Sequence, residues 1–232
     1  MKKLLVLTII FFICTITIGQ TTPINRTTQK HKAYNEAANK LLLVSNSLEQ
    51  VKRAFALGAN PNIKRNSFGA PFIDAIESNS IEMVQSFLDN GANPNLYLYD
   101  INFGESTPLW TAIIKHNYNM VELLINAGAD PNLAMKDGQT VLFWTVKYNT
   151  PNNIKLTKYL IKKGANINKI DNEGDTPLIV ACKNGNFEIA QTLLDHGANP
   201  NISNNEMRKP LYFAFKSQNQ NLINILLRVT KN

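Results

Sequence analysis

Three histidines are the first candidates for chemistry in this chain, because an imidazole can bind a metal or transfer a proton near neutral pH. They are His31, His116 and His196. A zinc site groups histidine with cysteine or carboxylate ligands at short, regular spacing, and none of the three has such partners at that spacing. His196 directly precedes a glycine, where a cation favours the end of a helix. We therefore expect no metal centre and no catalytic histidine.

The cysteines supply neither a disulfide framework nor a nucleophile. Cys14 lies in the apolar N-terminal segment, which leaves Cys182 for the rest of the chain. Cys182 follows Ala181 on a stretch expected to pack inward, and a buried free cysteine behaves as a small apolar side chain. A disulfide scaffold and a cysteine-rich metal site are both excluded.

Carboxylates and glycines also fail to form a recognisable site. Asp171, Glu173 and Asp175 lie close together in the sequence, but the run lacks the spacing and the later bidentate glutamate of a calcium loop. We interpret it as a solvated turn. No glycine-rich series of the phosphate-binding type occurs. The sequence thus predicts no catalytic residue, no metal and no cofactor.

The N-terminal segment 1–19 has the organisation of a secretory signal peptide. A basic start at 1–3 precedes an apolar run at 4–18, and the small residues ending at Gly19 predict cleavage after it. The run is shorter than the about 20 residues that a spanning helix needs, and an uncleaved anchor is the alternative. Lipid attachment at Cys14 is disfavoured, because a bulky isoleucine precedes it. We expect a bacterial periplasmic or secreted protein, without stable membrane insertion after cleavage.

Length and charge limit the remaining functions. The chain has 232 residues, of which 44% are apolar and 18% are charged, and its net charge is +7. This composition is typical of one or two globular domains rather than of a disordered or fibrous protein. The lysines and arginines are scattered without a dense patch, so we do not expect nucleic-acid binding.

A five-residue word organises the rest of the chain. It reads Gly-Ala, then Asn or Asp, then Pro or Ile, then Asn, and its glycines are 33, 37, 36 and 33 residues apart. The copies begin at Gly58, Gly91, Gly128, Gly164 and Gly197. Each word follows an amphipathic stretch, such as 81–88, whose apolar residues have nearly helical spacing. The glycine ends that helix in the left-handed conformation, and a proline prevents it from resuming.

Another helix is predicted after each word. Prolines that suit its first turn are Pro71, Pro177 and Pro210. Thr107 and Thr176 precede such prolines and are placed to cap the helices. Each unit is therefore expected to contain a helix, a tight turn, a second helix and a loop that projects sideways.

These residues resemble the ankyrin repeat. The stretches 176–186 and 193–201 together are close to a full copy of its pattern, and the resemblance covers about residues 33–229. It implies an all-α fold, an α-solenoid of about six stacked helix pairs with projecting β-turn fingers, in which neighbours share one core. The expected organisation is a signal peptide at 1–19, a polar leader at 20–32, an N-terminal cap at about 33–62, repeats at about 63–95, 96–132, 133–168 and 169–201, and a C-terminal cap at about 202–229.

The chain departs from the ankyrin pattern at two kinds of position. The family usually carries a histidine after Pro-Leu whose hydrogen bonds tie adjacent turns, and apolar or aromatic residues replace it here, so we expect packing to do that work. The replacements are Ile73, Trp110, Phe143, Ile179 and Tyr212. Met207 stands where a turn glycine is expected, which leaves the geometry of that finger open. We assign Trp110 and Trp144 to inward core positions, and we expect Leu194 to be buried between stacked helices.

The resemblance also implies where a partner binds, because ankyrin repeats contact proteins through a concave face made by the first helices and the finger loops. The corresponding residues here include four lysines and a tyrosine, namely Lys115, Lys147, Tyr148, Lys183 and Lys216. A row of lysines would steer the approach of an acidic partner. Ordinary solvated lysines are the alternative.

The enlarged second finger, 96–105, supplies the other candidate contact residues. Its Tyr97, Tyr99 and Phe103 give it the composition of a contact anchor rather than that of a neutral loop extension. The alternative is that these rings fold back against the neighbouring finger.

The sequence as a whole predicts an exported, non-catalytic ankyrin-repeat protein, expected to be a monomer, that binds a protein partner through its concave face and finger loops. An inhibitor or immunity protein that neutralises a toxin or hydrolase in the same compartment is the alternative. An enzyme with an improvised site at the acidic run 171–175 is the least favoured possibility.

Overall fold

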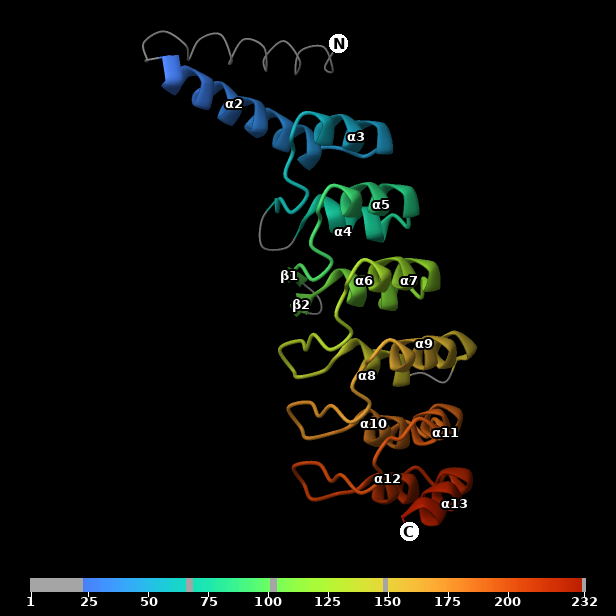
Figure 1. The fold of residues 1–232 in the computed structure, drawn as a ribbon. Coiled ribbons are helices and arrows are strands. Elements are labelled where there is room, and N and C mark those ends of the chain that lie inside the picture. The colour runs from blue at the N-terminus through green and yellow to red at the C-terminus, as the bar shows by residue number, and fades with distance from the viewer. Residues whose placement is uncertain (1–22, 66–68, 101–103, 148–149, 231–232) are drawn as a thin grey trace. The chain divides into compact units, whose positions relative to one another are not determined.

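The structure is a computed structural model that describes residues 23–65, 69–100, 104–147 and 150–230. It divides into two compact units, Met1–Asn93 (unit 1) and Pro94–Asn232 (unit 2). Unit 1 contains α2 (Pro23–Leu43), α3 (Leu48–Ala56), α4 (Pro71–Glu77) and α5 (Ile81–Asp89). Unit 2 contains β1 (Leu98–Asp100), β2 (Gly104–Ser106), α6 (Pro108–Ile114), α7 (Tyr118–Asn126), α8 (Val141–Val146), α9 (Pro151–Lys162), α10 (Pro177–Lys183), α11 (Phe187–Asp195), α12 (Pro210–Lys216) and α13 (Gln220–Val229). The described helices form six pairs (Figure 1), which confirms the predicted all-α solenoid of helix pairs.

The helix ends follow the predicted chemistry. The five word glycines have φ from 85° to 93°, the left-handed conformation expected after a helix. Thr107 and Thr176 accept the amides of Trp110 and Ile179 through Oγ1, each at 3.2 Å, and so satisfy helix N-termini. Proline opens α4, α10 and α12 as predicted.

The first described helix begins earlier than predicted. α2 starts at Pro23, so most of the segment 20–32, predicted to be a flexible polar leader, is helical. Proline suits the first helical turn because an amide there would lack a partner, and the Arg, Gln and Lys residues that follow are good helix formers. The predicted signal peptide at 1–19 lies outside the described residues. Within the described part of the chain, no helix is long and apolar enough to cross a membrane.

Unit 1 packs around aromatic side chains. α2 packs on α3, and both α3 and α4 pack on α5. The Phe87 ring of α5 lies 5.1 Å from the Phe55 ring of α3 and 5.5 Å from the Phe72 ring of α4, measured between ring centres. Phe72 and Phe87 are fully buried, and burying a side chain of this size stabilises a fold by about 1.5–3 kcal/mol.

In unit 2 the first helices of the pairs stack in order, with α6 on α8, α8 on α10 and α10 on α12. Cys182 on α10 is fully buried, as predicted, and burial raises the pKa of its thiol to about 12. On α11 Leu193 is fully buried, whereas Leu194 is only partly buried against the core. The prediction for Leu194 is wrong by one position, because a helix turns each successive residue by about a quarter of a turn.

The side chains that replace the expected histidine are mostly buried. Ile73, Trp110, Phe143 and Ile179 are at most 7% exposed, but Tyr212 in the last pair is 43% exposed. In four of the described pairs, a buried apolar side chain therefore takes the place of the histidine. In the last pair, the side chain at this position is exposed.

A ladder of asparagines also joins neighbouring words, and the sequence alone does not reveal it. In unit 1, Asn62 donates through Nδ2 to the Gly91 carbonyl at 3.0 Å, and its Oδ1 accepts the Asn93 amide at 2.6 Å. In unit 2, Asn95 and Asn132 each make the same two bonds to the next word. Each of these side chains thus satisfies a backbone carbonyl and a backbone amide in the turn that follows a helix.

Backbone hydrogen bonds connect successive fingers in unit 2. The Asn205 amide of the last finger donates to the Glu173 carbonyl of the preceding finger at 3.0 Å. Gly174, directly after that acceptor, has φ 76°, and Met207 at the same place in the last finger has φ 58°. Methionine therefore adopts the glycine conformation, and the last finger keeps the turn geometry.

Candidate interaction surface

The predicted lysines lie at the C-terminal ends of the first helices in unit 2. Lys115 and Lys147 are the C-cap residues of α6 and α8, and Lys183 and Lys216 are the last residues of α10 and α12. Because these four helices stack in order, their ends follow one another, and we call the four residues the lysine row. A cation is favourable at any helix C-terminus, so the position alone does not assign a partner.

Lys183 is held by carboxylates of its own chain. Its Nζ pairs with the Asp175 carboxylate and lies 3.6 Å from Glu173 Oε2. The same Nζ lies 5.0 Å from the centre of the Phe213 ring. Burial alone would lower the pKa of Lys183, but the hydrogen bonds and charges of Asp175 and Glu173 raise it further than burial lowers it. Lys183 is therefore firmly charged, and the chain itself neutralises that charge.

The acidic run is mostly buried, so the prediction of a solvated turn is wrong. Asp171 and Asp175 are 8% and 2% exposed. Asp171 Oδ1 accepts the amides of Glu173 and Asp175 at 3.0 and 2.9 Å, and its Oδ2 accepts from Gln139 at 3.2 Å. Burial raises the pKa of Asp171. These hydrogen bonds explain why the aspartates are buried, and the described residues contain no group of acidic, histidine or cysteine side chains that could hold a metal ion.

Lys147 lies over a pair of tryptophans. Its Nζ is 3.9 Å from the centre of the Trp144 ring, and that ring meets Trp110 edge-to-face at 5.5 Å. Trp110 is 2% exposed, which confirms its core assignment, whereas Trp144 is only partly buried. A cation over an indole gains about 0.5–1 kcal/mol at an exposed site, so the ring holds this lysine in place at the surface.

The second finger folds back where it is described. β1 and β2 pair antiparallel, and Leu96 and Leu98 are buried. Tyr97 is 39% exposed, and its hydroxyl donates to the Ala134 carbonyl of the next finger at 3.0 Å. Tyr97 is therefore tied to the next finger by its hydroxyl while its ring stays exposed, and both interpretations of the three rings stay predictions. The Tyr99 side chain, Phe103 and Tyr148 lie outside the described part of the structure.

A cleft of about 500 Å³ opens at the end of the lysine row. It is lined by Lys183, Glu206, Arg208, Phe213, Lys216 and Ser217. Arg208 Nη1 pairs with Glu206 Oε2 at 2.7 Å, and its guanidinium lies 4.6 Å from the centre of the Tyr212 ring. Among the described residues, Lys216 makes no ion pair. Three cations line the cleft, but Lys183 and Arg208 pair with carboxylates, so among the described residues Lys216 supplies the positive charge that no ion pair neutralises.

The excess of positive charge arises at one position of the repeat. Asp175 lies eight residues before Lys183 and neutralises it, whereas Arg208 lies eight residues before Lys216. The two positions therefore hold opposite charges, Asp175 and Lys183, in one repeat and like charges, Arg208 and Lys216, in the next. Sequence reasoning missed Arg208, although comparing this position between repeats would have found it. Because no carboxylate of the described residues pairs with Lys216, the last repeat can accept one from a partner.

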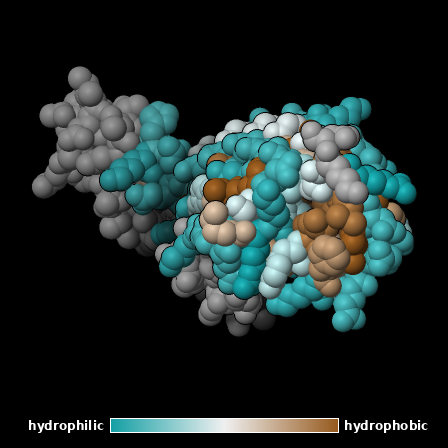
Figure 2. Space-filling view, turned by 90° about the horizontal axis from the view of Figure 1, so that it is seen from below, coloured by the Kyte–Doolittle hydropathy of each residue, from teal (hydrophilic) through white to brown (hydrophobic). Residues whose placement is uncertain are grey.

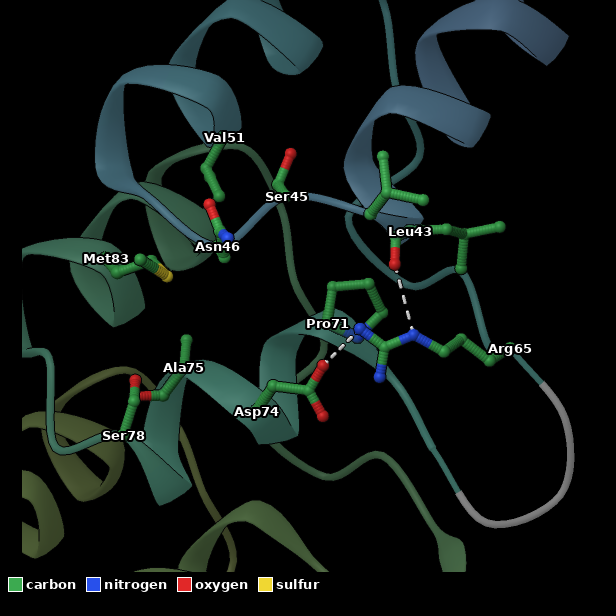
Figure 3. A pocket seen from close by; sticks show the side chains of 11 residues that line it. Leu43, Ser45, Asn46, Val51, Arg65, Pro71, Asp74, Ala75, Ser78 and Met83 are labelled. Carbon is green, nitrogen blue, oxygen red and sulfur yellow. Dashed lines mark hydrogen bonds and ion pairs between the residues drawn. The ribbon is translucent and has the colours of Figure 1, made fainter. Parts of the chain in front are cut away.

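Unit 1 contains a different, more apolar pocket of about 340 Å³ (Figure 3). Its apolar lining is Leu43, Val44, Val51, Pro71, Ala75 and Met83, and its polar lining is Ser45, Asn46, Arg65, Asp74 and Ser78. Arg65 donates through Nε to the Leu43 carbonyl at 3.1 Å and pairs through Nη2 with Asp74 Oδ2 at 2.5 Å. These bonds use the charges of Arg65 and Asp74 within the chain, and no sequence pattern pointed to this pocket.

Comparison with known proteins agrees with this architecture. A family model described as ankyrin repeats (3 copies) matches residues 35–135, 115–204 and 142–232. No curated protein matches the sequence. The matched regions contain the described words, the fingers between them and every described helix except the first part of α2. The chain belongs to the ankyrin-repeat family.

Proposed function

We propose that this chain is an exported, monomeric binding module that holds an acidic protein partner through the lysine row and the cleft at its last repeat. Ankyrin repeats generally mediate protein–protein interaction, and proteins built from them are typically non-catalytic. The matched family covers most of the chain. A binding role accounts for that coverage without requiring a catalytic centre.

One observation carries the proposal, namely the like-charged pair of Arg208 and Lys216 in the cleft. In the preceding repeat, the corresponding lysine is neutralised by Asp175. Arg208 keeps only Glu206 as a described ionic partner, and Lys216 has none among the described residues. The positive charge of Lys216, beside the solvent-accessible Arg208–Glu206 pair, attracts carboxylates and speeds the association of an acidic partner.

Export is the second part of the proposal. It is supported by the basic start, the apolar run and the small residues before Gln20. Expression of the full chain in a bacterial host, followed by fractionation and N-terminal sequencing, tests this part. A mature start at Gln20 in the periplasm or the medium supports export, and an intact chain in the cytoplasm refutes it.

The partner is tested with a crosslinking pull-down from the envelope fraction of the native host. One bait is residues 20–232, and a second bait carries Arg208→Glu and Lys216→Glu. The control bait carries Lys158→Glu and Lys162→Glu on α9, which changes the charge equally at two exposed sites. An acidic protein captured by the first and control baits, and lost with the second, supports the cleft as the binding site.

Equal capture by all three baits would rule out the cleft. A captured enzyme that loses activity at one equivalent of this chain would identify the inhibitor or immunity role. A partner that survives high salt unchanged would contradict an electrostatic contact, because exposed charges are screened within about 10 Å at 0.1 M salt.

A further inference from the structure

The last helix pair of unit 2 leaves uncovered a face that the earlier pairs bury. Two positions of each first helix define this face, and in α6, α8 and α10 they are at most 3% exposed. These residues are Trp110, Ile113, Phe143, Val146, Ile179 and Cys182. In α12 the same positions hold Tyr212 and Phe215, which are 43% and 54% exposed. Figure 2 views unit 2 from this end and shows apolar residues at the surface among hydrophilic ones.

The earlier faces are covered by a helix of the following pair, because each first helix packs on the next one. Tyr212 and Phe215 therefore continue an interface that the rest of unit 2 has already formed. They are also larger than Ile179 and Cys182 at the same positions in α10. Aromatic side chains bury about 150–250 Å² each, so the exposed parts of these two rings offer about 200 Å² to a partner.

A further finger in the same register cannot cover this face. A Cβ atom on Gly174 would lie 2.5 Å from Asn205 Oδ1 and 2.7 Å from the Asn205 amide nitrogen. The finger after Gly174 stacks only because glycine has no Cβ. Met207 has the equivalent place and a left-handed φ of 58°, and its side chain is 82% exposed. Met207 thus closes the finger stack, and what covers α12 must dock in another way.

The charges around the face define the occupant. Arg208 lies over the Tyr212 ring, exposed Lys209 directly precedes α12, and exposed Lys216 is its last residue. If a second copy of this chain docked on the same face, its cations would repel these cations, which disfavours self-association. Carboxylates around an apolar centre would complement them.

We propose that Tyr212 and Phe215, with Arg208, Lys209 and Lys216 as a basic rim, form an end face that docks an amphipathic helix of a partner protein. The apolar side of that helix packs on the two rings, and its flanking glutamates or aspartates meet the rim. This inference extends the proposed function to a second surface. It is tested by changing the rings alone, so Arg208 and Lys216 remain in the sequence and the two proposals can fail separately.

The probe is a fluorescein-labelled amphipathic peptide of about 20 residues with leucines on one face and flanking glutamates, long enough to form a helix. A second peptide has lysine in place of every glutamate. Fluorescence anisotropy follows titration with the full chain, with the variant Tyr212→Ser/Phe215→Ser, and with the control Tyr34→Ser. Tyr34 is 56% exposed on α2, so the control removes a comparable exposed ring, and circular dichroism confirms that each variant is folded.

We expect the glutamate peptide to bind the chain and the Tyr34 control equally, and the double variant at least tenfold more weakly. The lysine peptide should bind at least tenfold more weakly to all three proteins. Equal binding of both peptides, or no loss in the double variant, overturns the proposal. Sedimentation equilibrium that shows a dimer lost in the double variant would assign the face to a second copy instead. Binding to phosphatidylglycerol vesicles that depends on the two rings, without peptide binding, would assign it to a membrane surface.

Discussion

Replacing Gly174 with alanine tests how the fingers of unit 2 are joined. The added Cβ would have to occupy space 2.7 Å from the Asn205 amide nitrogen, so the last finger must move away. That movement breaks the bond from the Asn205 amide to the Glu173 carbonyl at 3.0 Å and the bond from Asn205 Nδ2 to the Asn172 carbonyl at 2.9 Å. Each such bond contributes about 0.5–1.5 kcal/mol. The left-handed φ of 76° adds about 1 kcal/mol of strain for alanine.

The expected loss in the free energy of unfolding is therefore about 3 kcal/mol. Equilibrium urea denaturation measures this loss, and amide hydrogen exchange at Asn205 shows whether the last finger has separated. The control is Gly197→Ala, because Gly197 has φ 90° with no atom within 4 Å of the added Cβ. That variant should lose only the strain, about 1 kcal/mol.

The reverse change, Met207→Gly, supplies a further comparison. It removes a strained methionine conformation but gives the unfolded chain more freedom, so the free energy of unfolding should change by no more than about 1 kcal/mol. The reasoning is refuted if Gly174→Ala is no more costly than Gly197→Ala, or if exchange at Asn205 is unchanged.

Other predictions concern single buried or paired side chains. In a Cys14→Ser background, Cys182 should react with a thiol reagent at pH 8 only in urea, because its folded pKa is about 12; rapid reaction of the native chain would contradict its burial. The pKa of Lys183 is raised in the folded state, so its stabilising contribution is present below the ordinary lysine pKa and is lost as pH rises through the folded value. The stability difference between wild type and Lys183→Met should therefore shrink above about pH 10.4, as measured by urea denaturation across pH. Leu193→Ala should cost about 2–5 kcal/mol and Leu194→Ala clearly less, and equal losses in thermal unfolding would overturn the assignment of the buried leucine.

The fold was predictable because each local signal in the repeat agrees with the global packing. Glycine after each helix, proline at the next N-terminus and threonine as N-cap all limit the backbone through short-range physics. The word spacing then places each helix pair. The same reasoning correctly assigned Cys182 and Trp110 to the core, because both lie on stretches whose apolar residues face inward.

Prediction failed where burial depends on partners that are distant in the sequence. Aspartate is usually exposed because it is charged. Hydrogen bonds from Gln139 and Asn204 nevertheless allow Asp171 and Asp175 to be buried. The leader was misjudged because its polarity resembles that of a loop, although its residues also favour a helix. Local polarity therefore indicates what a side chain can tolerate, and tertiary hydrogen bonds decide where it lies.

The last repeat brings several departures together, and they have one physical consequence. A terminal repeat that served only solubility would carry polar side chains on its outer face, but Tyr212 and Phe215 are aromatic and exposed. Met207 occupies the place where a following finger would stack, and Arg208 replaces the aspartate that neutralises the lysine of the preceding repeat. Arg208 in particular leaves Lys216 without the carboxylate that pairs with Lys183 in the preceding repeat. The same changes leave rings and cations available on the last repeat, which is where an acidic, partly apolar partner gains most from binding.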